Sequence, residues 1–333
     1  MCIRDRNGRG LICLPMTRER LEALQVPLMV DKNSSKFNTA FCVSIEAKRD
    51  VSTGISAADR ATTVRAAIDP ATRPQDLGRP GHMFPLRAED GGVLRRAGQT
   101  EAAVDLARMA GLYPAGVICE IMNEDGTMAR RDDLRRFAQH HDLKIGSIAE
   151  LISYRLSKEE SVEAVADLEV ETEFGPFRLV CMEDHINQAV HVALVRGKPD
   201  DVTPTLVRVH LQDTLSDVVG IQDPKLGWPL RSAMKLIAEE GCGVIVILRQ
   251  EELPKDLMRA VRGLEAQRDE LVTRRDHTAE LKTFGIGAQI LRALGVRRMR
   301  VLSAPKNMHA ISGFGLEVVE YVSSEEVSDE GEV

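Results

Sequence analysis

The chain has no long apolar run, no paired cysteines and no excess of basic side chains. Without an apolar run of about 18 residues, the sequence contains no transmembrane helix, and its start has no apolar segment of a signal peptide. The six cysteines are scattered without a C-x-x-C pair or metal-ligand spacing, which favours reduced thiols in the cytoplasm. With 44 basic against 51 acidic residues, the chain is a poor candidate for a non-specific binder of nucleic acid or membrane surfaces.

The composition of the chain is that of an ordinary globular protein. Apolar residues make up 43% of the chain and charged residues 29%, which excludes wholesale disorder. A length of 333 residues allows about two domains. Much of the negative charge lies after residue 160, and the segment Ser323–Val333 holds five acidic residues and no basic one. We interpret this segment as a solvated, mobile tail.

Strands and helices alternate along the first half, which indicates an α/β or layered α+β domain. Predicted strands cover residues 11–14, 41–46 and 117–121, and predicted helices cover residues 59–68, 101–110, 132–141 and 148–158. Thr100 is the expected N-cap of the second helix, and Gly111 follows the end of that helix.

The pattern restarts after a charged stretch, Lys158–Ala166, which we interpret as a linker or a helix end. Strands are predicted at residues 177–181, 191–195, 206–210, 244–248 and 296–303, with amphipathic helices at 230–238 and 286–294. We therefore predict a layered α/β domain at residues 1–160, a smaller α+β domain at 161–322 and the tail at 323–333.

Two arginine-containing segments have the residue types of an anion site. Ser52–Thr63 combines small residues, hydroxyls and Arg60 before a helix, and Leu94–Glu101 places Arg95, Arg96 and a hydroxyl at a helix start. Backbone N–H groups at a helix N-terminus together with a guanidinium can bind a phosphate. A helix start with a surface salt bridge explains the first segment equally well.

Two further features indicate proton transfer. His82 is flanked by a glycine and two prolines in Arg79–Leu86, so we predict that a rigid loop holds it. Glu120 ends an apolar strand, where a carboxylate is costly unless it is paired, a ligand or a proton carrier. A lone histidine is more often structural. Together the four features describe a pocket for a small phosphorylated polyol.

These motifs resemble those of 3,4-dihydroxy-2-butanone 4-phosphate synthase, an enzyme of riboflavin biosynthesis. Gly8–Pro15, Gly54–Val64, Arg79–Leu86 and Ala115–Ala129 occur in the family's order and spacing, and the resemblance covers residues 7 to about 155. It implies a homodimer that converts ribulose 5-phosphate to the butanone phosphate and formate with Mg²⁺ or Mn²⁺.

The resemblance also implies roles for individual residues. Those matching the family's catalytic positions are His82 and Glu120. Those matching positions that hold the substrate or line its site are Arg96, Gly98, Gln99, Thr100, Asp59, Arg60, Thr63 and Cys13. Gln99 replaces the family's metal-binding histidine, so we expect a weakened metal site, since a neutral amide oxygen can still bind Mg²⁺.

The family's domain begins with a further segment of about 40 residues, which holds an acidic metal-binding loop. This chain lacks that segment, and we expect that its N-terminus is truncated.

Residues from about 170 to 322 resemble GTP cyclohydrolase II. The resemblance is carried by Phe174–Leu179, His191–Gly197, Val207–His210, Ala238–Gly241, Leu248–Glu251 and Phe284–Leu291. Where that family holds zinc with three cysteines, this chain has Asp213, Pro224 and Leu226, and Lys282 and Phe284 stand at two catalytic positions. We therefore expect no zinc and no hydrolysis of GTP.

Two questions stay open at this point. Arg249, Gln250 and Glu251 match the family, which leaves residual nucleotide binding possible, but they are equally well explained as a strand end. The leading prediction is a synthase with a non-catalytic second domain. The alternative is a catalytically silent regulatory or scaffold relative in which both metal sites have been lost.

Overall fold

The computed structural model describes residues 7–35, 37–200, 203–221, 228–249, 254–265, 277–303 and 314–323. The chain divides into two compact units, Met1–Ile152 and Ser153–Val333. The division falls inside helix α6 (Ile148–Lys158). The second unit, which includes the C-terminal segment, is the longer of the two.

The first unit is built on a three-stranded sheet in the order β1-β3-β2. Its strands are β1 (Cys13–Met16), β2 (Ile45–Ala47) and β3 (Leu77–Arg87), and its other helices are α2 (Arg18–Ala23), α3 (Ala57–Ile68), α4 (Gln99–Met109) and α5 (Arg131–His140). β1 runs parallel to β3, with Cys13 opposite Phe84, and β2 runs antiparallel to β3. The predicted strand at 117–121 makes only isolated bridges, one of which joins Cys13 to Ile118.

Buried residues from all three strands build the core of this unit. Leu14 and Met16 of β1, Ile45 of β2 and Met83 of β3 are fully buried. Ala67 of α3 belongs to the same cluster, which fixes this helix against the sheet. Packing of this cluster positions the polar residues at the ends of the strands.

Two local predictions are wrong. Helix α4 begins at Gln99 with Gly98 as its N-cap, so Thr100 already lies in the first turn, with a buried side chain. Arg79–Leu86 is part of strand β3 rather than a loop. The pairing of β3 with β2 shifts at this point: Met83 lies opposite Ile45, but Gly78 lies opposite Glu46. The residues between Gly78 and Met83 form a bulge that contains His82.

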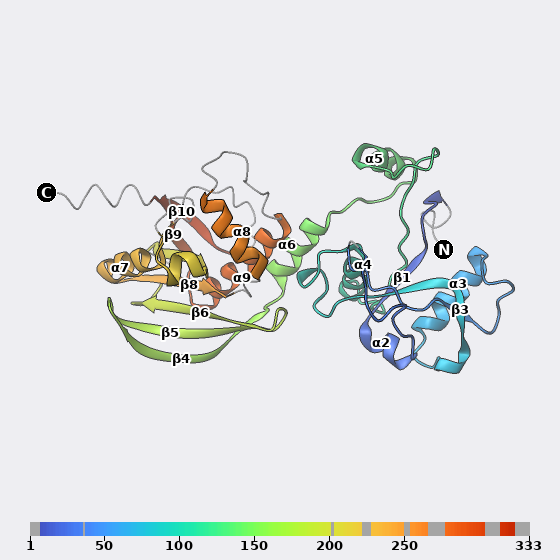
Figure 1. The fold of residues 1–333 in the computed structure, drawn as a ribbon, viewed down its shortest axis with the longest axis horizontal. Helices are drawn as coiled ribbons and strands as arrows, with labels where there is room; N and C mark the ends of the chain where they lie inside the picture. Colours follow the sequence, from blue (N-terminus) through green and yellow to red (C-terminus); the bar gives the residue numbers. More distant parts are fainter. Residues whose placement is uncertain are drawn as a thin grey trace. The chain divides into compact units, whose positions relative to one another are not determined.

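The second unit contains a seven-stranded mixed sheet in the order β10-β9-β7-β8-β6-β5-β4 (Figure 1). The strands are β4 (Val162–Thr172), β5 (Gly175–Asp184), β6 (Ala189–Arg196), β7 (Thr205–Leu211), β8 (Gly243–Leu248), β9 (Arg298–Leu302) and β10 (Glu317–Val322). Strand β4 covers much of the charged stretch that was predicted as a linker. Its side chains are mostly exposed, as is typical of an edge strand, and this hid the strand in the sequence.

Helices cover both faces of this sheet. The helices are α7 (Leu230–Glu240), α8 (Pro254–Glu265) and α9 (His277–Ala293), and a short π-helical turn spans Thr214–Val218. Ile237 of α7 packs with Leu206 of β7. Gly287 of α9 lies against the side chain of Val209, which is three residues further along β7. Because successive residues of a strand point to opposite faces, α7 and α9 lie on opposite sides of the sheet. Mixed helices and sheets in two units confirm the predicted α/β class.

A membrane-crossing segment would need a long apolar helix, and none of the helices in the described ranges meets that requirement.

Candidate active site

Glu120 is anchored beside the start of strand β1. Its Oε2 accepts a hydrogen bond from the backbone N–H of Leu11 at 3.0 Å, and its backbone oxygen accepts one from Gly10 at 3.2 Å. A Cβ atom on Gly10 would lie 2.6 Å from Oε2, so only glycine leaves room for the carboxylate in this position. The side chain is exposed at the surface, where it can carry a proton.

His82 pairs with a carboxylate that the sequence analysis did not single out. Its Nδ1 contacts Oε2 of Glu46, at the middle of β2. The Glu46 side chain is 21% exposed and that of His82 is 45% exposed, so the pair lies at the surface with its acid partly covered. His82 therefore has a fixed neighbour on one ring nitrogen.

Asp59 holds the turn before α3. Its Oδ2 accepts hydrogen bonds from the hydroxyl of Ser52 at 2.7 Å and from the N–H of Gly54 at 3.0 Å. The Ser52 hydroxyl, followed by backbone donors, lowers the pKa of Asp59 below its ordinary 3.8. Asp59 is thus an ionised turn anchor.

The two neighbouring α3 residues differ in their partners. The hydroxyl of buried Thr63 accepts the N–H of Ala47, which ties α3 to β2. Arg60 has a buried Nε atom for which the described residues supply no hydrogen-bond partner. Thr63 therefore supports the sheet, and Arg60 keeps a donor for a ligand.

Arg96 is held over the start of α4 by a buried carboxylate. Its Nη1 lies 2.6 Å from Oε2 of Glu101, and its Nη2 donates to the backbone oxygen of Phe37. Glu101 is fully buried and also accepts the N–H of Glu89 at 3.1 Å. A Cβ atom on Gly98 would lie 2.5 Å from Arg96 Nη1, so the glycine allows this approach.

Cys13 lies below these groups in the core. Burial, followed by the charges of Glu120 and Cys119, raises the pKa of its thiol to about 12. The thiol is therefore protonated at neutral pH and is a packing residue rather than a nucleophile.

The contacts arrange the predicted residues along β3 and just beyond its end. Continuing the β1–β3 register back from Cys13 and Phe84 brings Leu11 level with His82, so Glu120 and His82 flank the same stretch of backbone. Arg96 is tied through Glu101 to Glu89, which follows the end of β3 at Arg87 by two residues.

The described residues do not form a metal site by themselves. Gln99 is exposed at the first position of α4. Within the described ranges, no group of three or more His, Cys, Asp or Glu side chains could hold a metal ion. One neutral amide oxygen is a poor ligand set, and we derive no step through a metal.

Comparison with known proteins identifies both halves. The family model for 3,4-dihydroxy-2-butanone 4-phosphate synthase matches residues 1–154, and the model for GTP cyclohydrolase II matches residues 163–323. The 3,4-dihydroxy-2-butanone 4-phosphate synthase of Pseudomonas aeruginosa is 51% identical over 96% of this chain and 87% of its own length. The chain belongs to this synthase family.

Two further relatives share the two-domain organisation. The riboflavin biosynthesis protein RibBA of Synechocystis is 46% identical over 95% of this chain, which spans 58% of that relative. The crystal structure of RibBX, a two-domain 3,4-dihydroxy-2-butanone 4-phosphate synthase from A. baumannii, matches with a TM-score of 0.80 and 42% identity. That match covers 96% of this chain and 86% of the other. The first half is therefore the synthase domain, and the second half is the cyclohydrolase II domain.

Zinc does not fit the described part of the cyclohydrolase II domain. Asp213 stands where that family has a cysteine, but its Oδ1 caps the π-helical turn by accepting the N–H groups of Leu215 and Ser216 at 2.8 and 3.0 Å. Pro224 and Leu226 lie outside the described residues, and their side chains have no ligand atom. A carboxylate oxygen that already accepts two backbone hydrogen bonds as a helix cap is a poor zinc ligand.

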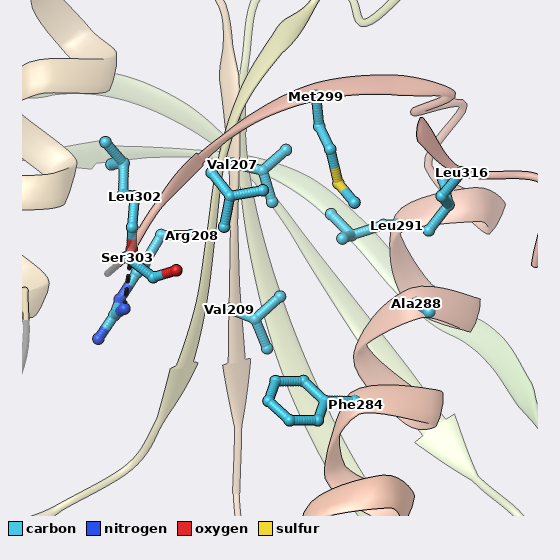
Figure 2. Close-up of a pocket in the computed structure, with 11 residues that line it drawn as sticks. Val207, Arg208, Val209, Phe284, Ala288, Leu291, Met299, Leu302, Ser303 and Leu316 are labelled. Atoms are coloured by element: carbon cyan, nitrogen blue, oxygen red, sulfur yellow. Dashed lines mark hydrogen bonds between the residues drawn. The ribbon is translucent and has the colours of Figure 1, made fainter. Parts of the chain in front are cut away.

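Phe284 lines a small apolar cavity in the cyclohydrolase II domain. The cavity has a volume of about 60 Å³ and lies between β7, β9 and α9, with Val209, Leu291 and Met299 around it (Figure 2). Arg208 lies at its other end and donates to the backbone oxygen of Leu302 at 2.9 Å. Burial lowers the pKa of Arg208 to about 10. An apolar cavity with a tethered guanidinium offers no hydrolytic group.

Arg249 is the first of three consecutive residues that resemble the cyclohydrolase II family, and it directly follows strand β8. Its backbone N–H donates to Nδ1 of buried His191 at 3.1 Å, and its side chain is exposed. Gln250 and Glu251 lie outside the described residues. Arg249 thus follows the end of β8 at Leu248, with its backbone tied to β6.

The sequence analysis missed two carboxylates of the synthase domain, Glu46 and Glu101. Glu46 ends the predicted strand at 41–46. A carboxylate at the end of an apolar strand is the pattern that singled out Glu120, and the same pattern could have singled out Glu46. Glu101 lies in the segment predicted to bind an anion, but no pattern indicated that it is fully buried.

Proposed function

We propose that the chain converts ribulose 5-phosphate to 3,4-dihydroxy-2-butanone 4-phosphate and formate, as a step of riboflavin biosynthesis. The observation that carries this proposal is the placement of His82 and Glu120 on either side of one backbone stretch, each held by a named contact. The family membership of residues 1–154 supports the substrate class. The atoms balance, because the five-carbon sugar phosphate is isomeric with the butanone phosphate plus formic acid.

In this proposal the chain's own residues move protons and bind the phosphate. His82 and Glu120 transfer protons as the enediol forms, water is lost, the carbon skeleton shifts, a water molecule adds back and C4 leaves as formate. Arg96 and the first-turn N–H groups of α4, with Gly98 and Thr100, bind the phosphate. Arg60 matches a position that lines the family's site, and in this proposal its guanidinium contacts a substrate oxygen.

Mg²⁺ or Mn²⁺ is included in the proposal on the family resemblance alone. Such an ion would stabilise the enolate-like charge of the substrate. Gln99 is the residue at the matching position, and its neutral oxygen predicts weak affinity. Formate release measured across a Mg²⁺ titration, with a chelator as the blank, tests this part.

We further propose that the synthase domain works as a homodimer. Membership of residues 1–154 in the synthase family supports this. An exposed apolar stripe on and after α4, formed by Leu106, Met109 and Leu112, offers a contact surface. Sedimentation equilibrium tests the oligomeric state.

For the second half we propose a non-catalytic domain without zinc. The capping role of Asp213 supports this, as does the absence of ligand atoms on Pro224 and Leu226. Zinc-dependent formate release from GTP would contradict it. If ribulose 5-phosphate also gives no formate, the silent regulatory alternative is the better account of the whole chain.

We place the protein in the cytoplasm, without nucleic-acid or membrane partners. The described cysteines form no disulfide, which supports a reducing compartment. Fractionation of cells that express the tagged chain tests this placement.

A further inference from the structure

The bulge in β3 directs His82 toward β2. Between Gly78 and Met83 the strand has extra residues that find no partner in β2. The N–H of Gly81 donates to the hydroxyl of Ser44 at 3.1 Å, which holds the bulge against β2. A Cβ atom on Gly81 would lie 2.2 Å from the backbone of Ile45, so the close approach requires glycine. Bulges of this kind re-aim a side chain.

Glu46 is itself held in place. Gly54 has a φ of +85°, and a Cβ atom there would lie 1.8 Å from Glu46 Oε2, so the turn of residues 52–54 packs directly on the carboxylate. Asp59 anchors that turn through Ser52 and Gly54. Thr63 fixes the next residue of β2, Ala47. The carboxylate is therefore positioned from two sides before any substrate binds.

We infer that Glu46 is the positioning residue for His82: its carboxylate accepts the Nδ1 proton and leaves Nε2 as the nitrogen that accepts the substrate proton. A carboxylate on one ring nitrogen selects the tautomer and the ring orientation, and it stabilises the imidazolium that forms during proton transfer. This inference rests on the proposed function for the role of Nε2, whereas the pairing itself is a property of the protein alone. Glu46 does not touch the reacting atoms in this account.

The test uses the full chain, three single variants and the double variant that combines Glu46→Gln with His82→Asn. Glu46→Gln removes the charge and keeps the shape. Glu22→Gln, on the exposed face of α2, is the matched control. His82→Asn assigns the His82 signals among the eight histidines. Melting temperatures establish that each variant is folded.

The first readout is the ring ¹⁵N spectrum of His82 without substrate. We expect the Nδ1–H tautomer in the wild type and in Glu22→Gln, and a shift toward Nε2–H in Glu46→Gln. An unchanged tautomer in Glu46→Gln overturns the inference. Because no turnover is involved, this result stands even if the proposed function fails.

The second readout is formate release from ribulose 5-phosphate. We expect Glu46→Gln to lower kcat by about 10- to 100-fold with KM within about twofold. In the His82→Asn background the same change should cost nothing further, because Glu46 acts through His82. An equal loss in both backgrounds indicates a purely structural role and overturns the inference. No formate from the wild type rejects the proposed function and leaves the first readout to decide the pairing.

Discussion

The Oε2 atom of Glu120 accepts a hydrogen bond from the backbone N–H of Leu11 at 3.0 Å. This contact joins two segments that are more than 100 residues apart and holds an exposed carboxylate beside the start of β1. It depends on the missing side chain of Gly10, which faces the same carboxylate.

The first prediction concerns Gly10→Ala. Its Cβ would lie 2.6 Å from Glu120 Oε2, so the carboxylate must move, and we expect a loss of formate release larger than the loss of stability. Overpacking of this kind costs about 1–3 kcal/mol. The control is Gly146→Ala, since a Cβ there meets nothing within 4 Å. Equal formate release by Gly10→Ala and Gly146→Ala would show that the reaction does not depend on the position of the Glu120 carboxylate beside Leu11.

The second prediction concerns acid stability. The folded-state pKa of Asp59 lies below its ordinary 3.8, so its ionised form stabilises the fold above that value. This contribution disappears as the pH falls through the folded-state pKa. Asp59→Asn should therefore lose stability at neutral pH and show a flatter decline toward acid. Urea unfolding between pH 2 and 7 measures this, with the exposed Asp132→Asn as the control, and parallel curves for wild type and Asp59→Asn would refute it.

The third prediction concerns the Cys13 thiol. With a pKa of about 12 and a buried side chain, it should react with iodoacetamide at pH 8 far more slowly in the native protein than in urea. Peptide mass spectrometry reports the modification at each cysteine. Rapid native alkylation of Cys13 would mean that the thiol is ionised and accessible.

The fourth prediction concerns assembly of the site from two copies. His82→Asn and Arg96→Ala should each release at least about a hundredfold less formate than the wild type when assayed alone. If the two groups meet across a dimer, random mixing of the variants gives one intact site in half of the dimers, or about a quarter of wild-type activity. Mixing under conditions of subunit exchange, followed by the formate assay, measures this. An inactive mixture would place both groups in one chain's site.

The fifth prediction concerns Asp213. As a helix cap, its replacement by alanine should lower the free energy of unfolding by about 1 kcal/mol. Added zinc should leave the melting temperature of both proteins unchanged. A zinc-dependent rise in the wild type that is absent from Asp213→Ala would assign this residue to a metal site.

Much of the fold could be predicted from local patterns. Helix α6 has the predicted bounds, and the prediction for α3 misses only its first two residues, because apolar spacing and flanking stop residues define such helices. The charged edge strand β4 was missed because an exposed strand carries no buried alternation.

The candidate site could be predicted only as a set of residue types. No pattern shows that the bulge at Gly81 brings His82 onto Glu46, since that contact depends on the register between β2 and β3. For the same reason the sequence could not show that Arg96 is tied through buried Glu101 to the segment that follows β3. Long-range register, rather than local propensity, decides both points.

The central claim is that this chain makes the butanone phosphate with His82 and Glu120 as its proton carriers. The most direct measurement is formate release from ribulose 5-phosphate and Mg²⁺ by the wild-type chain, His82→Asn and Glu120→Gln, with Glu22→Gln as the control. The account predicts formate from the wild type and the control, and at least about a hundredfold less from the two variants. Formate release that is unaffected by either variant, or absent from the folded wild type, would contradict it.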